Sequence, residues 1–408
     1  MLTRRSALLA SACFIGTGVP AFAQPRRSVP APHPGGAHGK KDQAAIPTDP
    51  ATTPIGPVDT AARWAYGQDF NTGATLLEKA ADDHMPPSSM TKLMTIYLVY
   101  ERLKQGKLKL DDQLLVSEKA WHMGGSKMFV QVGTQVAVED LIRGLIVDSG
   151  NDACIVLAEG IAGSEEQFVE LMNAKAKLFG MTNTNYKNCT GWPDPDQYMS
   201  ARDIATLAHH IIMDFPQYYH YDSEKTFKYN NIEQENRNPL VQRGSADGLK
   251  TGHTEAGGYG VVASTLRGNR RVILVLNGMT SMHQRAEESE RLMDWAFANF
   301  EDVTLFTAGD VVERVPVWLG ISPTVSLVGG RDLTVTMPRN WRNSASVKVS
   351  YDTPIQAPVA KGTPLGKLVV SGQGVPNMDV PLLAGEDVPR LGLPGRAIAV
   401  LSHYVTGG

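Results

Sequence analysis

The sequence lacks an excess of charge, internal repeats and clusters of metal-ligand residues. Its 408 residues carry 39 Lys and Arg against 42 Asp and Glu, for a formal net charge of −3. Such a chain has no electrostatic basis for binding nucleic acid. No His, Cys and Asp residues cluster at metal-ligand spacing, so we expect no metal and no other cofactor. Hydrophobic residues make up 42% of the chain, which is enough for sizeable cores in two domains.

Long apolar runs are missing at the N-terminus, where a short one has the form of an export signal. The first 24 residues are MLTRRSALLASACFIGTGVPAFAQ, in which Arg4 and Arg5 precede an apolar run that ends at Ala21-Phe22-Ala23. The run is too short to span a bilayer as a helix. A charged region, an apolar region and a small-x-small site are typical of a cleaved signal peptide. We therefore predict a signal peptide over residues 1–23 and an exported, periplasmic protein, with the Sec and twin-arginine routes both open.

Cysteine is scarce, and removal of the signal peptide leaves only Cys154 and Cys189. Export permits a disulfide, but the sequence does not reveal whether two cysteines are close enough to bond. Cys154 lies in the apolar helical stretch NDACIVLAEGI. That context favours a buried free thiol.

The composition changes along the chain and divides it into regions. Residues 24–54 are rich in Pro, Gly and charge, so we expect a flexible spacer there. Residues 55–300 alternate helical and strand patterns and form a predicted domain of mixed helices and strands. Residues 301–388 hold short β-like runs separated by Gly and Pro, which predict a small all-β domain. Residues 389–408 form a short tail.

Several elements of the mixed region are predicted by their periodicity and turn residues. Two strands flank the turn Asn71-Thr72-Gly73, and two more flank Gly268-Asn269. Apolar residues recur at helical spacing after Ser89. A second helical region is interrupted at Ser149-Gly150-Asn151, and Ser200 is placed to cap another helix.

The stretch PPSSMTKLMT could be an ordinary helix start or a nucleophile beside its base. Residues three and four apart are neighbours on a helix, so Lys92 can reach Ser89 or Ser88. A serine hydroxyl needs a neighbouring base, and a lysine can serve only when its amine is neutral. The spacing alone does not distinguish a capped helix with a solvated lysine from a catalytic pair.

Two further motifs follow in the sequence. Ser149-Gly150-Asn151 breaks a helical pattern within DSGND, and Lys250-Thr251-Gly252 precedes a hairpin within DGLKTGHTEAGGYG. Gly252 would let another backbone approach closely. Each motif alone could be an ordinary loop or an edge strand.

The three motifs together are much more specific. S-x-x-K, S-x-N and K-T-G in this order are the signature of penicillin-binding proteins and serine β-lactamases. From about residue 55 to about residue 390, the chain resembles low-molecular-mass penicillin-binding proteins that act as D-alanyl-D-alanine carboxypeptidases. The segments that carry this resemblance are PSSMTKLMT, SGNDAC, TNTNYKNCTGWPDPDQYMSARDIA and DGLKTGHTEAGGY. The resemblance implies an α+β catalytic domain, with an antiparallel sheet packed against helices, followed by a small all-β, sandwich-like domain.

The resemblance also implies roles for the residues of the first two motifs. It makes Ser89, rather than Ser88, the acylated nucleophile, and Lys92 its general base. Ser149 is similar to a proton relay toward the leaving amine. Asn151 is similar to a group that orients the substrate amide.

Further roles are implied at the strand that carries K-T-G. Lys250 and Thr251 would receive the terminal carboxylate of the substrate, and Arg285 would help to hold it. The backbone N–H groups of Ser89 and His253 would form the oxyanion hole, in which one donor is typically worth ~3 kcal/mol of barrier.

The predicted function is removal of the terminal D-Ala from peptidoglycan pentapeptide stems through an acyl-enzyme, with covalent inhibition by β-lactams. A D,D-endopeptidase that cuts cross-links shares all three motifs and is an open alternative. A β-lactamase is disfavoured because no Glu-x-x-Leu-Asn stretch follows Ser149 and because of the additional β domain. A non-catalytic cell-wall-binding protein would be expected to have lost Ser89 or Lys92.

The tail contains a short amphipathic candidate, GRAIAVLSHYV, from Gly395 to Val405. Ile398, Leu401 and Val405 could share one face, while the polar side holds a single arginine, Arg396. Interfacial helices gain affinity from buried apolar area and from basic charge. We expect either weak, reversible contact with a membrane surface or packing of this segment on the β domain.

Overall fold

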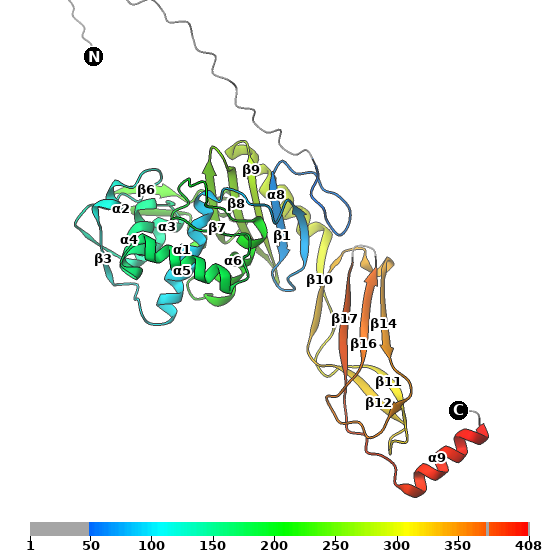
Figure 1. Cartoon of the computed structure of the whole chain (residues 1–408). Coiled ribbons are helices and arrows are strands. Elements are labelled where there is room, and N and C mark those ends of the chain that lie inside the picture. The colour runs from blue at the N-terminus through cyan, green and yellow to red at the C-terminus, as the bar shows by residue number, and fades with distance from the viewer. Residues whose placement is uncertain (1–48, 373–374, 407–408) are drawn as a thin grey trace, which may run out of the picture. The chain divides into compact units, whose positions relative to one another are not determined.

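The computed structural model describes residues 49–372 and 375–406. The predicted signal peptide and the predicted spacer up to residue 48 lie outside the described residues. The described chain holds a region of mixed helices and strands followed by a region of strands (Figure 1). The predicted fold class is therefore confirmed.

The centre of the mixed region is a five-stranded antiparallel sheet with the order β2-β1-β9-β8-β7. Both predicted strand pairs are present in it. Its strands are β1 (Trp64–Asp69), β2 (Thr75–Lys79), β7 (Gly248–Thr254), β8 (Gly258–Arg267) and β9 (Arg270–Met279). Because β7 is the last strand in this order, one of its edges remains open for the functional site.

Helices cover both faces of this sheet, as the alternation of side chains along β9 demonstrates. Leu274 and Leu276 belong to a core shared with α8 (Met282–Asn299), whereas Ile273 and Val275 point into the larger core on the other face. The main helices of that larger core are α1 (Lys92–Lys104), α3 (Val138–Ile146), α4 (Asn151–Ala162), α5 (Glu165–Leu178) and α6 (Ala201–Asp214). Shorter elements complete this layer: α2 (Glu118–His122), β3 (Gln113–Leu115), β4 (Gln135–Ala137), β5 (Thr226–Tyr229) and β6 (Ile232–Glu235). The short α7 (Pro239–Arg243) instead contributes Leu240 to the core shared with α8.

The second region is built from strands, with one short 3-10 turn at Trp341–Asn343. A two-stranded sheet pairs β10 (Phe300–Phe306) with β13 (Leu333–Pro338). A six-stranded sheet has the order β14-β16-β17-β12-β11-β15, with β14 (Ala345–Tyr351), β16 (Pro364–Gly372), β17 (Val375–Ala384), β12 (Thr324–Gly329), β11 (Val311–Trp318) and β15 (Ile355–Gln356). Phe306 and Val335 of the first sheet share a core with Val315 and Leu327 of the second.

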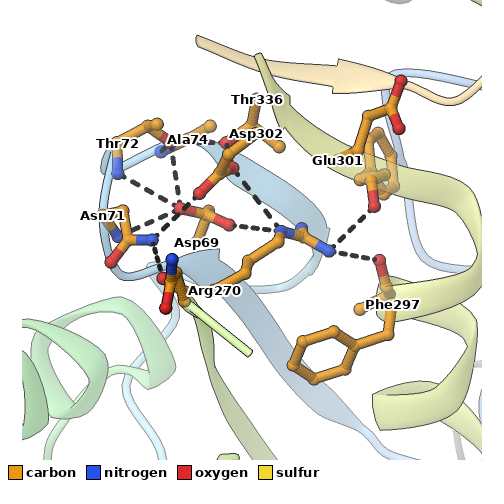
Figure 2. A network of polar contacts seen from close by, with 12 residues as sticks. Asp69, Asn71, Thr72, Ala74, Arg270, Phe297, Glu301, Asp302 and Thr336 are labelled. Atoms are coloured by element: carbon orange, nitrogen blue, oxygen red, sulfur yellow. Dashed lines mark hydrogen bonds and ion pairs between the residues drawn. The ribbon is translucent and has the colours of Figure 1, made fainter. Parts of the chain in front are cut away.

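A buried ion cluster lies where β10 follows α8 (Figure 2). The Arg270 side chain donates from Nε to Asp69 at 2.8 Å and lies 3.5 Å from Asp302. Arg270 also donates to two carbonyl oxygens at the end of α8. Asp69 is fully buried, and Thr72 near it contacts Thr336 of β13 at 2.5 Å. The cluster therefore joins the edge of the catalytic sheet to the first strand pair of the β region.

The end of the predicted spacer is more ordered than expected. Ala51 is fully buried and pairs with Val58, while Thr52 pairs with Glu78 of β2. Paired backbone therefore begins before the predicted boundary at residue 54. The apolar Ala51 side chain and the free edge of β2 are the features that hold this segment.

The tail forms helix α9 (Leu393–Thr406), two residues longer at its start than the predicted Gly395–Val405. Pro394 lies in the first turn of this helix, where proline fits because its missing N–H has no partner to lose. The apolar side chains Ile398, Leu401, Tyr404 and Val405 are exposed. Within the described residues, no helix is both long enough and apolar enough to cross a membrane.

Candidate active site

The two neighbouring serines of the first motif point to different partners. Ser88–Thr91 form a short 3-10 turn that leads into α1, whose first residue is Lys92. Ser89 Oγ lies 3.0 Å from the Lys92 Nζ. Ser88 has a left-handed φ of 51°, and its Oγ instead contacts Thr254 Oγ1 at 3.0 Å. The geometry therefore pairs Lys92 with Ser89 and binds Ser88 to the end of β7.

The surroundings of the Lys92 amine suit its neutral form. Lys92 is fully buried, and its Nζ lies 2.7 Å from Asn151 Oδ1 and 2.5 Å from the Thr190 carbonyl oxygen. A neutral amine has two N–H donors and one lone pair. The two oxygens can accept both N–H groups, which leaves the lone pair to accept the Ser89 hydroxyl proton. Burial lowers the pKa of Lys92 from 10.5 to about 8, because the charged form loses its hydration.

The second motif forms a strained turn at the start of α4. Ser149 has a φ of 58°, which a residue with a Cβ rarely adopts, and Asn151 begins the helix. The Asn151 side-chain amide donates to the Gly124 carbonyl at 2.7 Å, so its Oδ1 is held toward Lys92. The predicted interruption of this helical region is thus present, and it aims two polar side chains into one site.

The third motif places a second buried lysine, Lys250, beside the residues of the first two motifs. Lys250 Nζ on β7 donates to Ser149 Oγ at 2.8 Å, and only 3% of this lysine is exposed. Burial lowers the pKa of Lys250 well below its ordinary value, and the nearby Lys92 lowers it further. Neither lysine forms an ion pair with a carboxylate in the part of the chain that the structure describes.

The glycine of the third motif is required by close approach of two backbones. A Cβ at Gly252 would lie 2.9 Å from the Ser88 Cβ and 3.2 Å from the Ser89 nitrogen. β7 therefore runs directly beside the serine turn, as the sequence predicted for this glycine. Thr251 is buried next to it, and the exposed His253 stacks its ring on Tyr259 at 3.9 Å.

Arg285 lies close to this group on the first turns of α8. Its side chain is 7% exposed, and its Nη2 donates to the Arg237 carbonyl at 3.1 Å. Burial lowers the pKa of Arg285 to about 10, and its positive charge contributes to the lowered pKa of Lys250. Among the described residues, no hydrogen bond joins Arg285 to Thr251 or Lys250, and the Arg285 Nε has no hydrogen-bond partner there.

Three features of the site were missed in the sequence. Thr190 supplies a carbonyl to Lys92, Trp192 is 46% exposed beside the site, and the Arg237 guanidinium donates to Ser126 Oγ at 2.5 Å. They are brought in by folding over long sequence distances and have no local spacing that marks them. Gly191, next to Thr190, is required by a close approach of two backbones, since a Cβ there would lie 1.8 Å from the Ser88 carbonyl oxygen.

Ser89 and Asn151 border a cavity of about 550 Å³. Its walls come from the loop after α2, from Asn151, from the Thr190–Pro193 loop and from the end of β7. The two cysteines lie behind this site, both buried and free, as the context of Cys154 predicted. No group of His, Cys, Asp and Glu residues able to hold a metal occurs within residues 49–372 and 375–406.

Similarity to known proteins agrees with this geometry. A family model described as D-alanyl-D-alanine carboxypeptidase, peptidase S11, matches residues 51–280. A model described as the C-terminal domain of penicillin-binding protein 5 matches residues 300–390. The carboxypeptidase DacA of Haemophilus influenzae is 41% identical over 337 residues, which cover 80% of this chain and 85% of that protein. DacC of Escherichia coli is 39% identical, with coverage of 80% and 84%.

Solved structures of similar proteins extend over both regions. Penicillin-binding protein 5 from Haemophilus influenzae is 40% identical and superposes with a TM-score of 0.73, over 82% of this chain and all of that one. Penicillin-binding protein 6B from Escherichia coli is 32% identical, with a TM-score of 0.68 over 83% and 98% of the two chains. The S-x-x-K, S-x-N and K-T-G side chains meet through hydrogen bonds beside the cavity, and Ser89 and Asn151 line it. The chain belongs to the family of serine-type D-alanyl-D-alanine carboxypeptidases.

Proposed function

We propose that the enzyme removes the terminal D-Ala from the pentapeptide stems of peptidoglycan, with Ser89 as nucleophile. Ser89 Oγ attacks the carbonyl carbon of the penultimate D-Ala, and the bond to the terminal D-Ala amine breaks. Water then hydrolyses the resulting ester and regenerates the serine. The observation that carries this proposal is the Lys92 amine, buried 3.0 Å from Ser89 Oγ with two carbonyl oxygens placed for its two N–H groups.

Lys92 acts as the general base of the acylation step. It accepts the Ser89 proton as the serine attacks, and the resulting ammonium is stabilised by Asn151 and Thr190. Ser149, which accepts a hydrogen bond from Lys250, passes a proton to the leaving amine. Asn151 also orients the substrate amide.

Lys250, Thr251 and Arg285 receive the free carboxylate of the substrate. Lys250 and Arg285 are buried cations without a carboxylate partner in the described chain, so an anionic ligand would offset the cost of burying them. Gly252 keeps β7 close enough for the substrate backbone to pair with it. The backbone N–H groups of Ser89 and His253 form the oxyanion hole.

β-Lactams should acylate the same serine, because they present a strained amide beside a carboxylate. A solved penicillin-binding protein D2 from Listeria monocytogenes, 27% identical with a TM-score of 0.54, was crystallised in an ampicillin-bound form. Ser89→Ala should abolish labelling by a fluorescent penicillin and release of D-Ala, while Ser88→Ala retains most of both. Loss with Ser88→Ala and retention with Ser89→Ala would reverse the assignment.

The balance between carboxypeptidase and endopeptidase activity needs a direct product analysis. Mass analysis of purified muropeptides after exposure to the enzyme should show loss of one D-Ala from pentapeptide stems. Conversion of cross-linked dimers into monomers at a comparable rate would instead assign the endopeptidase activity.

We also propose export to the periplasm and weak contact of α9 with a membrane surface. The exposed apolar side chains of α9 support this contact, and the single Arg396 limits its strength. Deletion of residues 391–408 should leave activity on soluble substrates intact and move the protein from the membrane fraction to the soluble periplasm. A full-length protein that is entirely soluble at low salt would contradict the contact.

A further inference from the structure

A second cavity, of about 490 Å³, adjoins the catalytic one. The two share the Gly191–Pro193 segment together with Thr254 and Ala256. The second cavity also reaches Ser88 and the segment from His84 to Pro87, which the catalytic cavity does not. It is therefore a continuation of the site, on the side away from Lys250.

The direction of β7 determines which part of a substrate this second cavity would meet. The proposed function places the substrate carboxylate at Lys250 and the reacting carbonyl beside Gly252. The second cavity lies at Thr254 and Ala256, at and beyond the end of the strand. A stem peptide laid along β7 thus leaves toward this cavity with the end that is attached to the glycan strand. An extended chain advances about 3.3 Å per residue, so a few stem residues span this part of the strand.

The lining of the second cavity is aromatic and apolar. The His84 and Tyr198 rings stack at 3.8 Å with an angle of 13° between their planes, and the exposed Trp192 contributes a third ring. Several prolines complete the walls: Pro86, Pro87, Pro193 and Pro195. Among the described residues, no Lys or Arg lines the cavity, and Asp194 adds a negative charge.

This chemistry suits a sugar ring better than the stem peptide itself. The C–H faces of a pyranose are apolar and slightly positive, and they pack on the negative faces of aromatic rings. Pockets of this kind bind ligands with apolar walls and a few polar groups. The acidic residue of a stem peptide would meet the Asp194 carboxylate and no cationic side chain of Lys or Arg.

The rings are held in place before any ligand binds. Tyr198 pairs its backbone with Asn185, and the adjacent Met199 pairs with Met85, the neighbour of His84. The loop that carries Trp192 is fixed by the Asn188 side chain, which accepts from the Gly191 and Trp192 N–H groups. Such a preformed surface loses little conformational entropy on binding.

We propose that this second cavity is a saccharide subsite that binds a sugar ring of the glycan strand to which the stem peptide is attached. This inference rests on the proposed function, since it needs the substrate carboxylate at Lys250. It predicts that the enzyme distinguishes a glycan-linked stem from the same peptide without sugar.

The test compares kcat/KM for a disaccharide-linked pentapeptide and for the bare pentapeptide. The wild type should favour the disaccharide-linked substrate about three- to tenfold, the range of one or two aromatic contacts. Tyr198→Ala and His84→Ala should bring the ratio close to one, mainly through KM, while Tyr198→Phe keeps the ring and the preference. Trp121→Ala removes an exposed aromatic side chain that lines neither cavity and serves as the control.

A wild-type ratio near one would overturn the subsite, and this outcome does not depend on the folding of any variant. A ratio that survives both Tyr198→Ala and His84→Ala, or an equal loss on both substrates in these variants, would also overturn it. Failure of the proposed function would appear differently, as absent penicillin labelling or absent D-Ala release by the wild-type enzyme on either substrate.

Discussion

Two of the buried charge clusters among the described residues are compensated to very different degrees. Near β10, Arg270 is held by Asp69, by Asp302 and by two carbonyl oxygens. In the candidate active site, Lys92, Lys250 and Arg285 are equally buried, but none forms an ion pair with a carboxylate among the described residues. One nearby carboxyl, Asp148, has its pKa raised to about 7 by burial, so it is partly protonated at neutral pH.

The difference separates a structural cluster from a functional one. A buried charge with its partners in place can be accommodated, whereas a buried charge without a partner costs free energy of folding. Cations that remain uncompensated in a folded protein therefore indicate a site that receives an anion or keeps an amine neutral. The following experiments test whether the two clusters differ in this way.

The largest expected effect is on catalysis and comes from Lys92. Lys92→Ala should lower the rate of acylation by penicillin about 10²- to 10⁴-fold, because the general base is lost. The variant should lose acylation while it is still folded, although the lost hydrogen bonds to Asn151 and Thr190 and the cavity left behind also lower the free energy of unfolding. Stopped-flow labelling and denaturant unfolding measure the two effects, with the exposed Lys107→Ala as control. Acylation within tenfold of wild type would show that another group takes the proton.

The opposite result is expected for the paired cluster. Asp69→Ala should lower the free energy of unfolding by about 3–5 kcal/mol, because Arg270 is left buried without its nearest carboxylate. The acylation rate of the folded protein should stay unchanged. Asp83→Ala, at an exposed position, is the matched control for denaturant unfolding. A loss of acylation without a loss of stability would contradict the structural role of this cluster.

A smaller effect is expected from the second lysine. Lys250→Ala should weaken hydrolysis of peptides with a free C-terminal carboxylate about tenfold or more relative to amidated analogues. The reason is that a charge-assisted hydrogen bond is typically worth ~1.5–3 kcal/mol. Steady-state kinetics on the two substrates measures the ratio. An equal loss on both would give Lys250 a part in the chemical step instead of in carboxylate binding.

The smallest change is a pH dependence of the wild-type enzyme. The pKa of Lys92 is lowered to about 8, and only the neutral amine can accept a proton. Acylation by penicillin should therefore rise with pH, about tenfold per unit well below that pKa, and become constant above it. Rates of acylation measured across this range check the sign. A rate that falls as pH rises toward 8 would contradict the neutral base.

The parts of this site that follow from short-range spacing could be predicted from the sequence. Helical geometry places Lys92 near Ser89 or Ser88, and Gly252 indicates a close backbone approach. Helical spacing alone left both serines open, and only the family resemblance favoured Ser89. In the structure the left-handed turn at Ser88 and its contact with Thr254 separate them.

Long-range contacts were not predictable in this way. Arg237, Thr190 and Trp192 join the site from distant segments whose local sequence carries no period or spacing. The same holds for Asp69 and Arg270, which are 201 residues apart in the chain. Helix caps, by contrast, depend on hydrogen bonds between residues close in sequence and were predictable. Ser200 caps its helix as expected, and its side chain accepts from the Asp203 N–H.

The central claim is that burial without an anionic partner keeps the Lys92 amine able to accept a proton near neutral pH. The most direct test is an NMR titration of the protein with ¹³C-labelled lysine side chains, in which the Lys92 signal is assigned by its absence from Lys92→Met. The account predicts a midpoint of about 8 for this signal. A midpoint near 10.5, the ordinary value for lysine, would contradict it.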